Sequence, residues 1–294
     1  MAVPVTLMRL LMKQDLEYLL DVGRQAARLA AERIKTIYEQ YLSGGNIDIR
    51  EKGKDDPVTA ADMAANQIIK EKLKGIFAEH AILTEEEPDT WNNTGYEWVW
   101  MIDPLDGTRD FIKANGEFVT MIGLTHRGEP TIGVVVEPVT GLELYACKGL
   151  GAYKSWLSQR DTSVRVNMND APDLKNLRLA VSRSHRDPKI DTFIEILSIQ
   201  REIPSGSVGR KLAMVINGEA DIYVHPARGT KLWDTCACDV IASEAGGVLL
   251  SGTGEPISYL RPSGDVENHY GLLVCSTNIL DKVVWASRSV WGLN

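Results

Sequence analysis

Apolar residues recur at steps of three and four near the start of the chain, which is the period of an α-helix. The recurrence runs over residues 15–42 and stops at Ser43-Gly44-Gly45. A second helical pattern follows Pro57, with Thr59 as its N-cap and Asp62 as the partner in a capping box. We therefore predict two amphipathic helices in succession. The side chains expected on the buried face of the second are Met63, Ala64, Ile68, Leu73 and Ile76.

From Trp98 the pattern changes to short apolar runs that are typical of β-strands. Two of these runs are joined at His126–Pro130 in the manner of a hairpin, and a third run covers 142–147. After residue 176, strands and helices alternate. The expected strands are 177–181, 220–224, one near 248 and 271–275, and the expected helices are 189–198, 211–217 and 235–245.

These elements predict an α+β first half with an antiparallel sheet and an α/β second half. The polar stretch over residues 158–176 is the best place for a boundary. We accordingly divide the chain into an N-terminal half, residues 1–160, and a C-terminal half, residues 161–294.

The composition excludes several classes of protein. With 44% hydrophobic and 24% charged residues, the chain is neither collagen-like nor disordered. Its 32 Lys and Arg against 40 Asp and Glu give a net charge of −8, where a nucleic-acid binder is expected to be basic. An acidic protein that handles anionic substrates needs the help of cations, so either cations take part or the substrate is not anionic.

The four cysteines form no CxxC pair and have no His partners at zinc-finger spacing. We expect them to be buried thiols in a reducing compartment. No apolar run approaches the ~18 residues that a membrane span requires, so we expect a cytoplasmic protein without a membrane partner.

The segment over residues 100–112 carries the clearest chemical signal, because a buried-looking strand ends in Asp103-Pro104-Leu105-Asp106-Gly107-Thr108. Two carboxylates across a turn stiffened by proline can converge on one point, as hard cations require. Gly107 lets the backbone approach a ligand and leaves amide N–H groups free to face an anion. Asp and Gly are also common turn residues, so a turn that only closes a strand is the structural alternative.

Two more acidic positions lie at the ends of apolar runs. Glu85-Glu86-Glu87 follows a short run at 81–84, and Asp234 lies at a strand-to-helix junction. Taken singly, the glutamates could be a solvated loop and Asp234 a helix cap. Three acidic strand ends in one chain are explained more economically by a shared site.

The four motifs DPLDGT (103–108), WDTCA (233–237), LTEEE (83–87) and DDPVTAAD (55–62) resemble those of the inositol monophosphatase superfamily, whose members are magnesium-dependent, lithium-sensitive phosphomonoesterases. The resemblance runs from about residue 15 to residue 278. It implies a layered αβαβα sandwich of the inositol monophosphatase and fructose-1,6-bisphosphatase type. The site is then expected at the junction of the two halves.

Within the superfamily, SRSH (182–185), GSVGRK (206–211) and the cysteine in WDTCA resemble the 3'(2'),5'-bisphosphate nucleotidases. One feature departs from the bacterial and fungal members of that branch. They carry a serine pair before the lysine, where this chain has Val208 and Gly209. The animal members have a glycine-rich version that is closer to this sequence.

The resemblance implies two or three bound Mg²⁺ ions, which suit oxygen ligands. The implied ligands are Glu85, Asp103, Asp106, Asp234 and the backbone carbonyl of Leu105. Glu85 is carried over as the first acid of its run, in place of Glu86 or Glu87. Bound cations would invert the local potential and so let an acidic protein bind a phosphate.

The resemblance also implies a catalytic dyad, in which Asp62 accepts a hydrogen bond from Thr108 and Thr108 orients the attacking water. Asp62 has a second interpretation as the capping partner of Thr59, and both roles can hold at once. The residues implied for substrate binding are Gly107, Thr108, Ser182, His185, Ser207, Lys211 and Asp234. A basic cluster that would suit two phosphates comprises Arg183, His185, Arg186, Arg210 and Lys211, with Arg228 as a weaker member. His185 could also be an ordinary surface histidine.

The activity expected from the resemblance is hydrolysis of the 3'-phosphate of adenosine 3',5'-bisphosphate to AMP and phosphate, inhibited by Li⁺. One alternative is an inositol polyphosphate 1-phosphatase acting on inositol 1,4-bisphosphate, or an enzyme with both activities. A different class is a non-catalytic sensor of these phosphates. A sensor predicts a broken metal set or dyad, whereas every implied side chain is present in this sequence.

Overall fold

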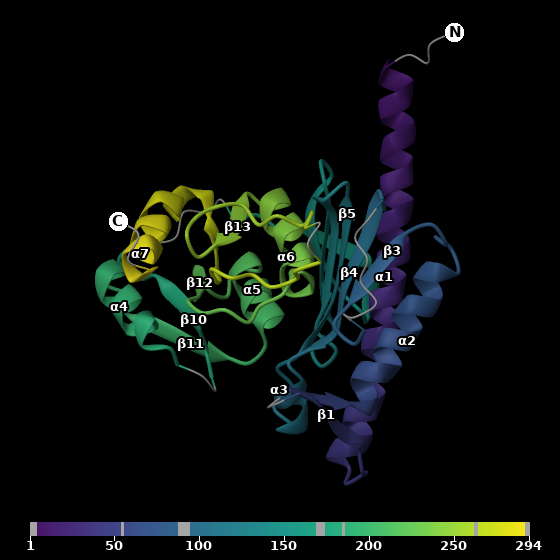
Figure 1. Cartoon of the computed structure of the whole chain (residues 1–294), viewed down its shortest axis with the longest axis horizontal. Coiled ribbons are helices and arrows are strands. Elements are labelled where there is room, and N and C mark those ends of the chain that lie inside the picture. The colour runs from purple at the N-terminus through teal and green to yellow at the C-terminus, as the bar shows by residue number, and fades with distance from the viewer. Residues whose placement is uncertain are drawn as a thin grey trace.

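The computed structural model describes residues 5–53, 56–87, 95–168, 174–183, 186–261 and 264–291. These residues form five layers in the order helices, sheet, helices, sheet, helices (Figure 1). The predicted αβαβα sandwich is confirmed. The helices of the first, third and fifth layers are α1 (Val5–Leu42) with α2 (Ala60–Lys74), α5 (Val208–Ile216) with α6 (Leu232–Glu244), and α4 (Pro188–Leu197) with α7 (Leu280–Trp291).

The first sheet has seven strands in the order β3-β4-β5-β6-β7-β8-β9. Its strands are β3 (Ala81–Thr84), β4 (Trp98–Asp106), β5 (Val119–His126), β6 (Glu129–Val136), β7 (Leu142–Cys147), β8 (Gly151–Trp156) and β9 (Gln159–Arg165). Only β3 and β4 pair in parallel, and the other neighbours are antiparallel. The predicted hairpin is confirmed by the pairing of His126 with Glu129.

The second sheet has five strands in the order β11-β10-β12-β14-β13. Its strands are β10 (Arg178–Ser182), β11 (Arg201–Ser205), β12 (Ile222–His225), β13 (Gly247–Ser251) and β14 (Leu272–Ser276). The pairs of β10 with β11 and β12 are parallel, whereas β14 is antiparallel to both of its neighbours. The smaller elements are the hairpin β1 (Ile49–Gly53) and β2 (Asp56–Thr59), the short helix α3 (Thr108–Ile112) and the 3₁₀ turn η2 (Thr277–Ile279).

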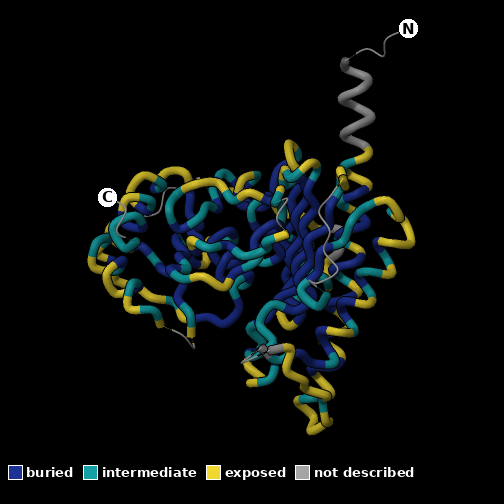
Figure 2. The backbone as a smooth tube through the Cα atoms, viewed as in Figure 1, coloured by how far each residue is buried: buried dark blue, intermediate teal, exposed yellow. Residues whose placement is uncertain are grey.

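The main hydrophobic clusters fill the spaces between the layers, and the buried segments in Figure 2 run through the two sheets and the helices between them. One cluster joins α1 and α2 to the first sheet, a second joins that sheet to α5, α6 and the second sheet, and a third lies under α4 and α7. Because the first sheet is covered on both faces, β5 is buried along nearly its whole length.

Helix α2 begins as predicted, with Thr59 as its N-cap and Asp62 completing a capping box. The predicted buried face is confirmed at Leu73, which is fully buried, but is wrong at Met63 and Ile76, which are 49% and 39% exposed. The face that packs against α1 and β4 instead carries Ala61, Asp62, Ala65, Asn66, Ile69 and Leu73. The small side chains of Ala61 and Ala65 let α2 pack against α1. With this face of α2 turned to the core, Asp62 is buried and Met63 is exposed.

The boundary that we placed at residues 160/161 stays a prediction. Strand β9 spans this position and pairs with β8, so the first sheet continues to Arg165. If the chain is divided into two halves, the strand pairing favours a division after β9.

Helix α6 lies very close to the first sheet because two glycines leave room for it. Gly123 of β5 and Gly133 of β6 are cross-strand partners. A Cβ at Gly123 would lie 2.5 Å from Cys236 Sγ, and a Cβ at Gly133 would lie 2.1 Å from the Ala237 carbonyl oxygen. The glycine pair therefore sets the depth at which α6 begins, and with it the position of Asp234.

All four cysteines are free and buried, as predicted for plain core thiols. Among the described helices, none is both long and apolar enough to cross a membrane. The C-terminal helix α7 packs on α4 and β14 through Val283 and Ala286, while Trp285 is 58% exposed.

Candidate active site

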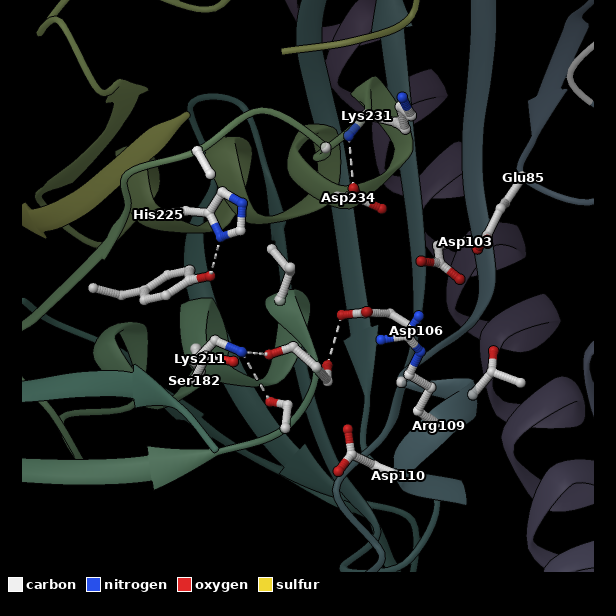
Figure 3. A pocket seen from close by; sticks show the side chains of 18 of the residues that line it. Glu85, Asp103, Asp106, Arg109, Asp110, Ser182, Lys211, His225, Lys231 and Asp234 are labelled. Atoms are coloured by element: carbon white, nitrogen blue, oxygen red, sulfur yellow. Dashed lines mark hydrogen bonds between the residues drawn. The ribbon is translucent and has the colours of Figure 1, made fainter. Parts of the chain in front are cut away.

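A cavity of about 1280 Å³ lies between the two sheets, and chain segments from both halves line it (Figure 3). One end carries acidic side chains from the first half, together with Asp234. The other end carries Lys211 and an apolar wall from β10, β12 and α4. The predicted site residues that line this cavity are Glu85, Asp103, Leu105, Asp106, Gly107, Thr108, Ser182, Ser207, Lys211 and Asp234.

A bulge in β4 turns Asp103 and Asp106 to the same face of the sheet. Asp103 pairs with Met121 and Asp106 with Val119, so β4 holds one residue more than β5 between these pairs. Met121 and Val119 both face α5 and α6, and their partners on β4 therefore do so too. Strand β4 continues through this bulge and ends at Asp106, within the segment where the sequence predicted its end.

Glu85 reaches the same place because β3 and β4 are parallel. Thr84 pairs with Ile102, and the Glu85 N–H donates to the Ile102 carbonyl at 3.1 Å. The residue after β3 is thus the neighbour of Asp103, and the charge of Glu85 acts on the Asp103 carboxyl group. Glu86 also lines the cavity, whereas Glu87 is paired with Lys70.

Asp234 is the third residue of α6 and one of its oxygens caps that helix. The Lys231 N–H donates to Asp234 Oδ2 at 2.6 Å. Asp234 therefore caps α6, as the sequence analysis allowed, but it uses only its Oδ2 atom for this bond. The carboxyl group also faces the cavity, on the side where Asp103 and Asp106 approach it (Figure 3).

The acidic end is electrostatically unfavourable without a cation. Burial, followed by the charges of Glu85, Asp106 and Asp234, raises the pKa of Asp103 well above its usual range. Burial and the charges of Asp106 and Glu85 do the same to the pKa of Asp234. Asp103 Oδ1 is buried and has no hydrogen-bond partner among the described residues. A buried acceptor without a donor, inside a group of carboxylates, fits a hard cation.

The carboxylates would have to share such a cation with other oxygens. Within the described ranges, no three Asp, Glu, His or Cys side chains are arranged to hold a metal ion by themselves. Mg²⁺ is commonly bound through only one or two carboxylates and keeps several waters. One or two of these carboxylates, with the Leu105 carbonyl that lines the cavity, fit that mode of binding.

Thr108 and Asp62 are in direct contact, as the resemblance implied. The Thr108 hydroxyl donates to Asp62 Oδ1 at 2.8 Å, while Oδ2 accepts from the N–H and the hydroxyl of Thr59 at 2.8 and 2.5 Å. Asp62 is 1% exposed, and burial raises its pKa although the bonds from Thr59 and Thr108 oppose the shift. Asp62 therefore caps α2 with one oxygen and holds Thr108 with the other.

At the far end, Lys211 is the buried cation of the cavity. Only 3% of it is exposed, and its Nζ donates to the carbonyl oxygens of Gly206, at 3.2 Å, and Ser207. The apolar wall beside it includes Val181, Ile190 and Val224. The Gly206-Ser207 turn links Lys211 to the acidic end, because the Ser207 carbonyl accepts from Lys211 Nζ and the Ser207 hydroxyl donates to Asp106. Arg109 and Asp110 also line the cavity.

The predicted basic cluster is not assembled as expected. Arg183 forms an ion pair with Glu117, Arg210 lies 3.9 Å from Glu137, and neither lines the cavity. Arg186 lines it, but pairs with Asp191 and Glu202. These carboxylates compete with a phosphate for the arginines. Glu117 and Glu137 come from the first half of the chain, whereas Asp191 and Glu202 lie in α4 and β11, close to Arg186 in the sequence. His185 lies outside the described residues, and Arg228 does not line the cavity although its neighbours Ala227 and Gly229 do.

Ser207 has a contact that the sequence did not predict. Its hydroxyl donates to Asp106 Oδ2 at 2.6 Å and accepts from the Arg210 N–H at 2.9 Å. In this arrangement its single hydroxyl proton is directed to Asp106, not to a ligand.

Sequence reasoning also missed several cavity residues. The Nζ atom of Lys52, on β1, lies 2.8 Å from Glu85 Oε1 and 3.1 Å from Glu86 Oε1. The Tyr223 hydroxyl lies 3.2 Å from His225 Nδ1, at the end near Lys211. Burial, followed by the charge of Lys211, lowers the pKa of His225, so this ring is neutral at pH 7. No local signal marks these residues. Lys52 lies on the β1–β2 hairpin, and Tyr223 and His225 lie on β12, which pairs with the distant strands β10 and β14.

Comparison with known proteins gives a consistent result. Residues 15–284 match the model of the inositol monophosphatase family. The 3'(2'),5'-bisphosphate nucleotidase CysQ of Escherichia coli (strain K12) is 34% identical over 82% of this chain and 94% of its own length. Among solved structures, CysQ from Bacteroides thetaiotaomicron is 30% identical with a TM-score of 0.72, covering 88% of this chain and 97% of that one. The suppressor protein suhB of Bartonella henselae shares the fold, with a TM-score of 0.75 over 92% and 98% of the chains at 22% identity.

Proposed function

Because the chain belongs to the inositol monophosphatase family, we propose that it is a 3'(2'),5'-bisphosphate nucleotidase that hydrolyses the 3'-phosphate of adenosine 3',5'-bisphosphate to AMP and phosphate. The observation that carries the proposal is the cavity itself. One part of the cavity carries the set of carboxylates that fits a cation, with Thr108 bonded to Asp62 beside it. Another part carries the buried ammonium group of Lys211.

In this proposal Glu85, Asp103, Asp106, Asp234 and the Leu105 carbonyl hold two or three Mg²⁺ ions. Bound Mg²⁺ stabilises charge on the phosphoryl oxygens and provides a nucleophilic water near neutral pH. The protein residues supply the hard oxygen donors and their fixed spacing. The β4 bulge, the parallel β3–β4 pair and the glycine pair under α6 set that spacing.

Thr108 orients the attacking water. Its hydroxyl proton lies on the hydrogen bond to Asp62 Oδ1, so a lone pair of Thr108 Oγ1 is left to accept from a water on the cavity side. Asp62 keeps this orientation because its other oxygen is fixed by two bonds from Thr59. The amides of Gly107 and Thr108 bind the scissile phosphate in this proposal.

The other end of the cavity supports a nucleotide more than an inositol phosphate. An inositol ring carries a hydroxyl on nearly every carbon, and these hydroxyls would lose hydrogen bonds to water against Val181, Ile190 and Val224. A purine offers an apolar face to the same wall. Lys211 then binds the 5'-phosphate, with Ser182 and Ser207 near the ribose.

The test is phosphate release with Mg²⁺ from adenosine 3',5'-bisphosphate and inositol 1,4-bisphosphate at matched concentrations, with and without Li⁺. Much faster phosphate release from the nucleotide than from the inositol phosphate, with that release inhibited by Li⁺, supports the proposal. Comparable rates would mean that the cavity selects phosphate spacing and not the base. Release from neither substrate would contradict the proposal and favour a sensor.

Lys211 predicts a pH effect that depends on the substrate. Burial lowers the pKa of Lys211 to about 8, against the opposing charges of Asp106, Asp110 and Glu117. The ammonium is therefore lost above pH 8, and kcat/KM for the bisphosphate should fall by up to about tenfold per pH unit there. A pH profile of initial rates, compared with the profile for adenosine 3'-monophosphate, measures the effect.

Lys211→Met provides the control for this profile. Its kcat/KM for the bisphosphate should fall about 10- to 100-fold at pH 7, the range for a hydrogen bond to a charged group. The fall in kcat/KM above pH 8 should be absent in the variant. If wild type shows the same fall with the monophosphate, another group causes it and Lys211 does not bind the second phosphate.

A further inference from the structure

The turn Gly206-Ser207, which links β11 to α5, is held by two carboxylates from the first half of the chain. The Gly206 N–H donates to Glu117 Oε2 at 2.7 Å, and the Ser207 hydroxyl donates to Asp106 Oδ2 at 2.6 Å. Ser207 has φ +54 and ψ 141, a conformation that an L-residue adopts at a cost. A strained turn persists only when its surroundings hold it, and here those two contacts come from across the cavity.

Glu117 is itself held in place by Arg183. The Arg183 Nε and Nη2 atoms donate to Glu117 Oε2 and Oε1 at 3.0 and 2.5 Å, a bidentate pair. Arg183 also donates from Nη2 to the Pro204 carbonyl at 3.0 Å, so it bridges Glu117 to the strand that leads into the turn. Burial alone would raise the pKa of Glu117, but Arg183 and the Gly206 N–H bring it below its usual value.

The same turn determines where the Lys211 ammonium lies. Lys211 Nζ donates to the carbonyl oxygens of Gly206 and Ser207, and the side chain is almost fully buried. Glu117 thus fixes the N–H of Gly206, while Lys211 binds its carbonyl. The peptide group after Gly206 carries that carbonyl, so a change in the backbone dihedral angles of Gly206 would move an acceptor of Lys211 relative to the N–H that Glu117 binds. A Cβ at Gly206 would lie 2.2 Å from the Asp110 carboxylate, so the turn has little room to shift as a whole.

We propose that Glu117, fixed by Arg183, is a positioning residue that places Lys211 for the second phosphate of the substrate. The inference rests on the proposed function for the identity of that phosphate. It gives Arg183 a role different from the phosphate contact predicted from the sequence. Glu117 acts through the turn and touches neither the scissile phosphate nor the dyad.

The consequence is a selective loss for bisphosphate substrates. In Glu117→Ala, the contacts of Ser207 and of the Gly209 N–H with Asp106 remain, so the acidic end of the cavity is preserved. The KM for adenosine 3',5'-bisphosphate should rise about tenfold, as for the loss of one charge-assisted hydrogen bond. The kcat/KM for adenosine 3'-monophosphate should stay within about twofold, since that substrate has no second phosphate.

The experiment compares the two substrates in wild type, Glu117→Gln, Glu117→Ala and Glu97→Ala. Glutamine keeps one acceptor oxygen for the Gly206 N–H. The KM of Glu117→Gln for the bisphosphate should therefore lie between those of wild type and Glu117→Ala. Glu97 forms a similar ion pair with Arg127, but neither residue lines the cavity, so its variant controls for loss of an ion pair. Hydrogen exchange of the peptide over residues 205–212 adds a readout that needs no substrate. Exchange there should be fastest in Glu117→Ala, and in Glu97→Ala it should equal that of wild type.

The outcomes separate this inference from the proposed function. A rise in KM confined to the bisphosphate, with faster exchange at 205–212, supports it. Equal losses on both substrates, or unchanged exchange, would overturn it in favour of a general structural role for Glu117. If wild type fails to hydrolyse the bisphosphate, the proposed function falls, and the second-phosphate role falls with it even where exchange is faster.

Discussion

Replacing Asp103 by Asn is expected to lower the rate of phosphate release by about 10³-fold, because cation stabilisation of transition-state charge is worth several kcal/mol. With a cation bound, Asp103 carries a negative charge beside Glu85, and its Oδ1 has no hydrogen-bond partner among the described residues. The amide is nearly isosteric, so the shape of the cavity is kept while the charge is lost. The measurement is kcat at saturating Mg²⁺ and substrate.

The same variant should have a second, opposite effect on stability. Without metal, wild type holds mutually repelling carboxylates at this end of the cavity, and the neutral amide removes part of that repulsion. The Tm of Asp103→Asn in EDTA should therefore equal or exceed that of wild type. Added Mg²⁺ should raise the Tm of wild type, by linkage of binding to folding, and raise that of the variant much less.

Asp221→Asn is the matched control for Asp103→Asn. Asp221 accepts from Arg178 Nε and Nη2 at 2.9 and 2.7 Å and does not line the cavity. The same chemical change there should lower the Tm yet preserve the activity and the response to Mg²⁺. An Asp103→Asn variant that retains a tenth of wild-type activity would contradict the assignment of Asp103 as a metal ligand.

The second large effect is expected at Thr108. Thr108→Val keeps the shape but removes the hydroxyl that bonds Asp62, and kcat should fall by about 10²-fold or more, the range for a lost general-base contribution. Thr108→Ser restores a hydroxyl and should recover activity to within about tenfold of wild type. The two variants differ mainly in the hydroxyl group, so kcat at saturating Mg²⁺ isolates its role.

Two readouts distinguish catalysis from structure in this case. The Mg²⁺-dependent rise in Tm should be kept in Thr108→Val, because the carboxylates are untouched. Thr125→Val is the control, since the buried Thr125 hydroxyl donates to the Val99 carbonyl at 3.4 Å on the same sheet. Its activity should remain near that of wild type. Equal activity of Thr108→Val and Thr108→Ser would rule out the dyad.

Much of the local structure could be predicted from the sequence alone. The capping box at Thr59 and Asp62 and the hairpin at residues 126–129 were both confirmed. These features depend on residues within a few positions of one another, where spacing and turn chemistry act directly. The expected face of α2 was confirmed at Leu73 but wrong at Met63, because the face that packs against α1 carries the small residues Ala61 and Ala65. Which side of a helix is buried depends on its partner, and the partner is not a local property.

The acidic residues of the candidate site could also be named from their motifs, but their arrangement could not. The one-residue bulge between Asp103 and Asp106 appears only when β4 is paired with β5. The close approach of α6 depends on Gly123 and Gly133, more than 100 positions before Asp234 in the numbering of the chain. Each distance in the cavity is therefore a product of strand register and layer packing.

The basic end was the least predictable part of the site. Arg183 and Arg210 were expected at the phosphates, but carboxylates from the first half of the chain pair with them or approach them. Glu117, without a signal in its own segment, determines one side of the Gly206-Ser207 turn. By itself, the sequence determined the succession of helices and strands and the cap of α2, because these follow from short-range periodicity and side-chain chemistry. The order of the layers and the acidic residues proposed as metal ligands were implied by the family motifs. Only the tertiary structure decided which charges meet, because an ion pair forms wherever folding brings opposite charges together, whatever their separation along the chain.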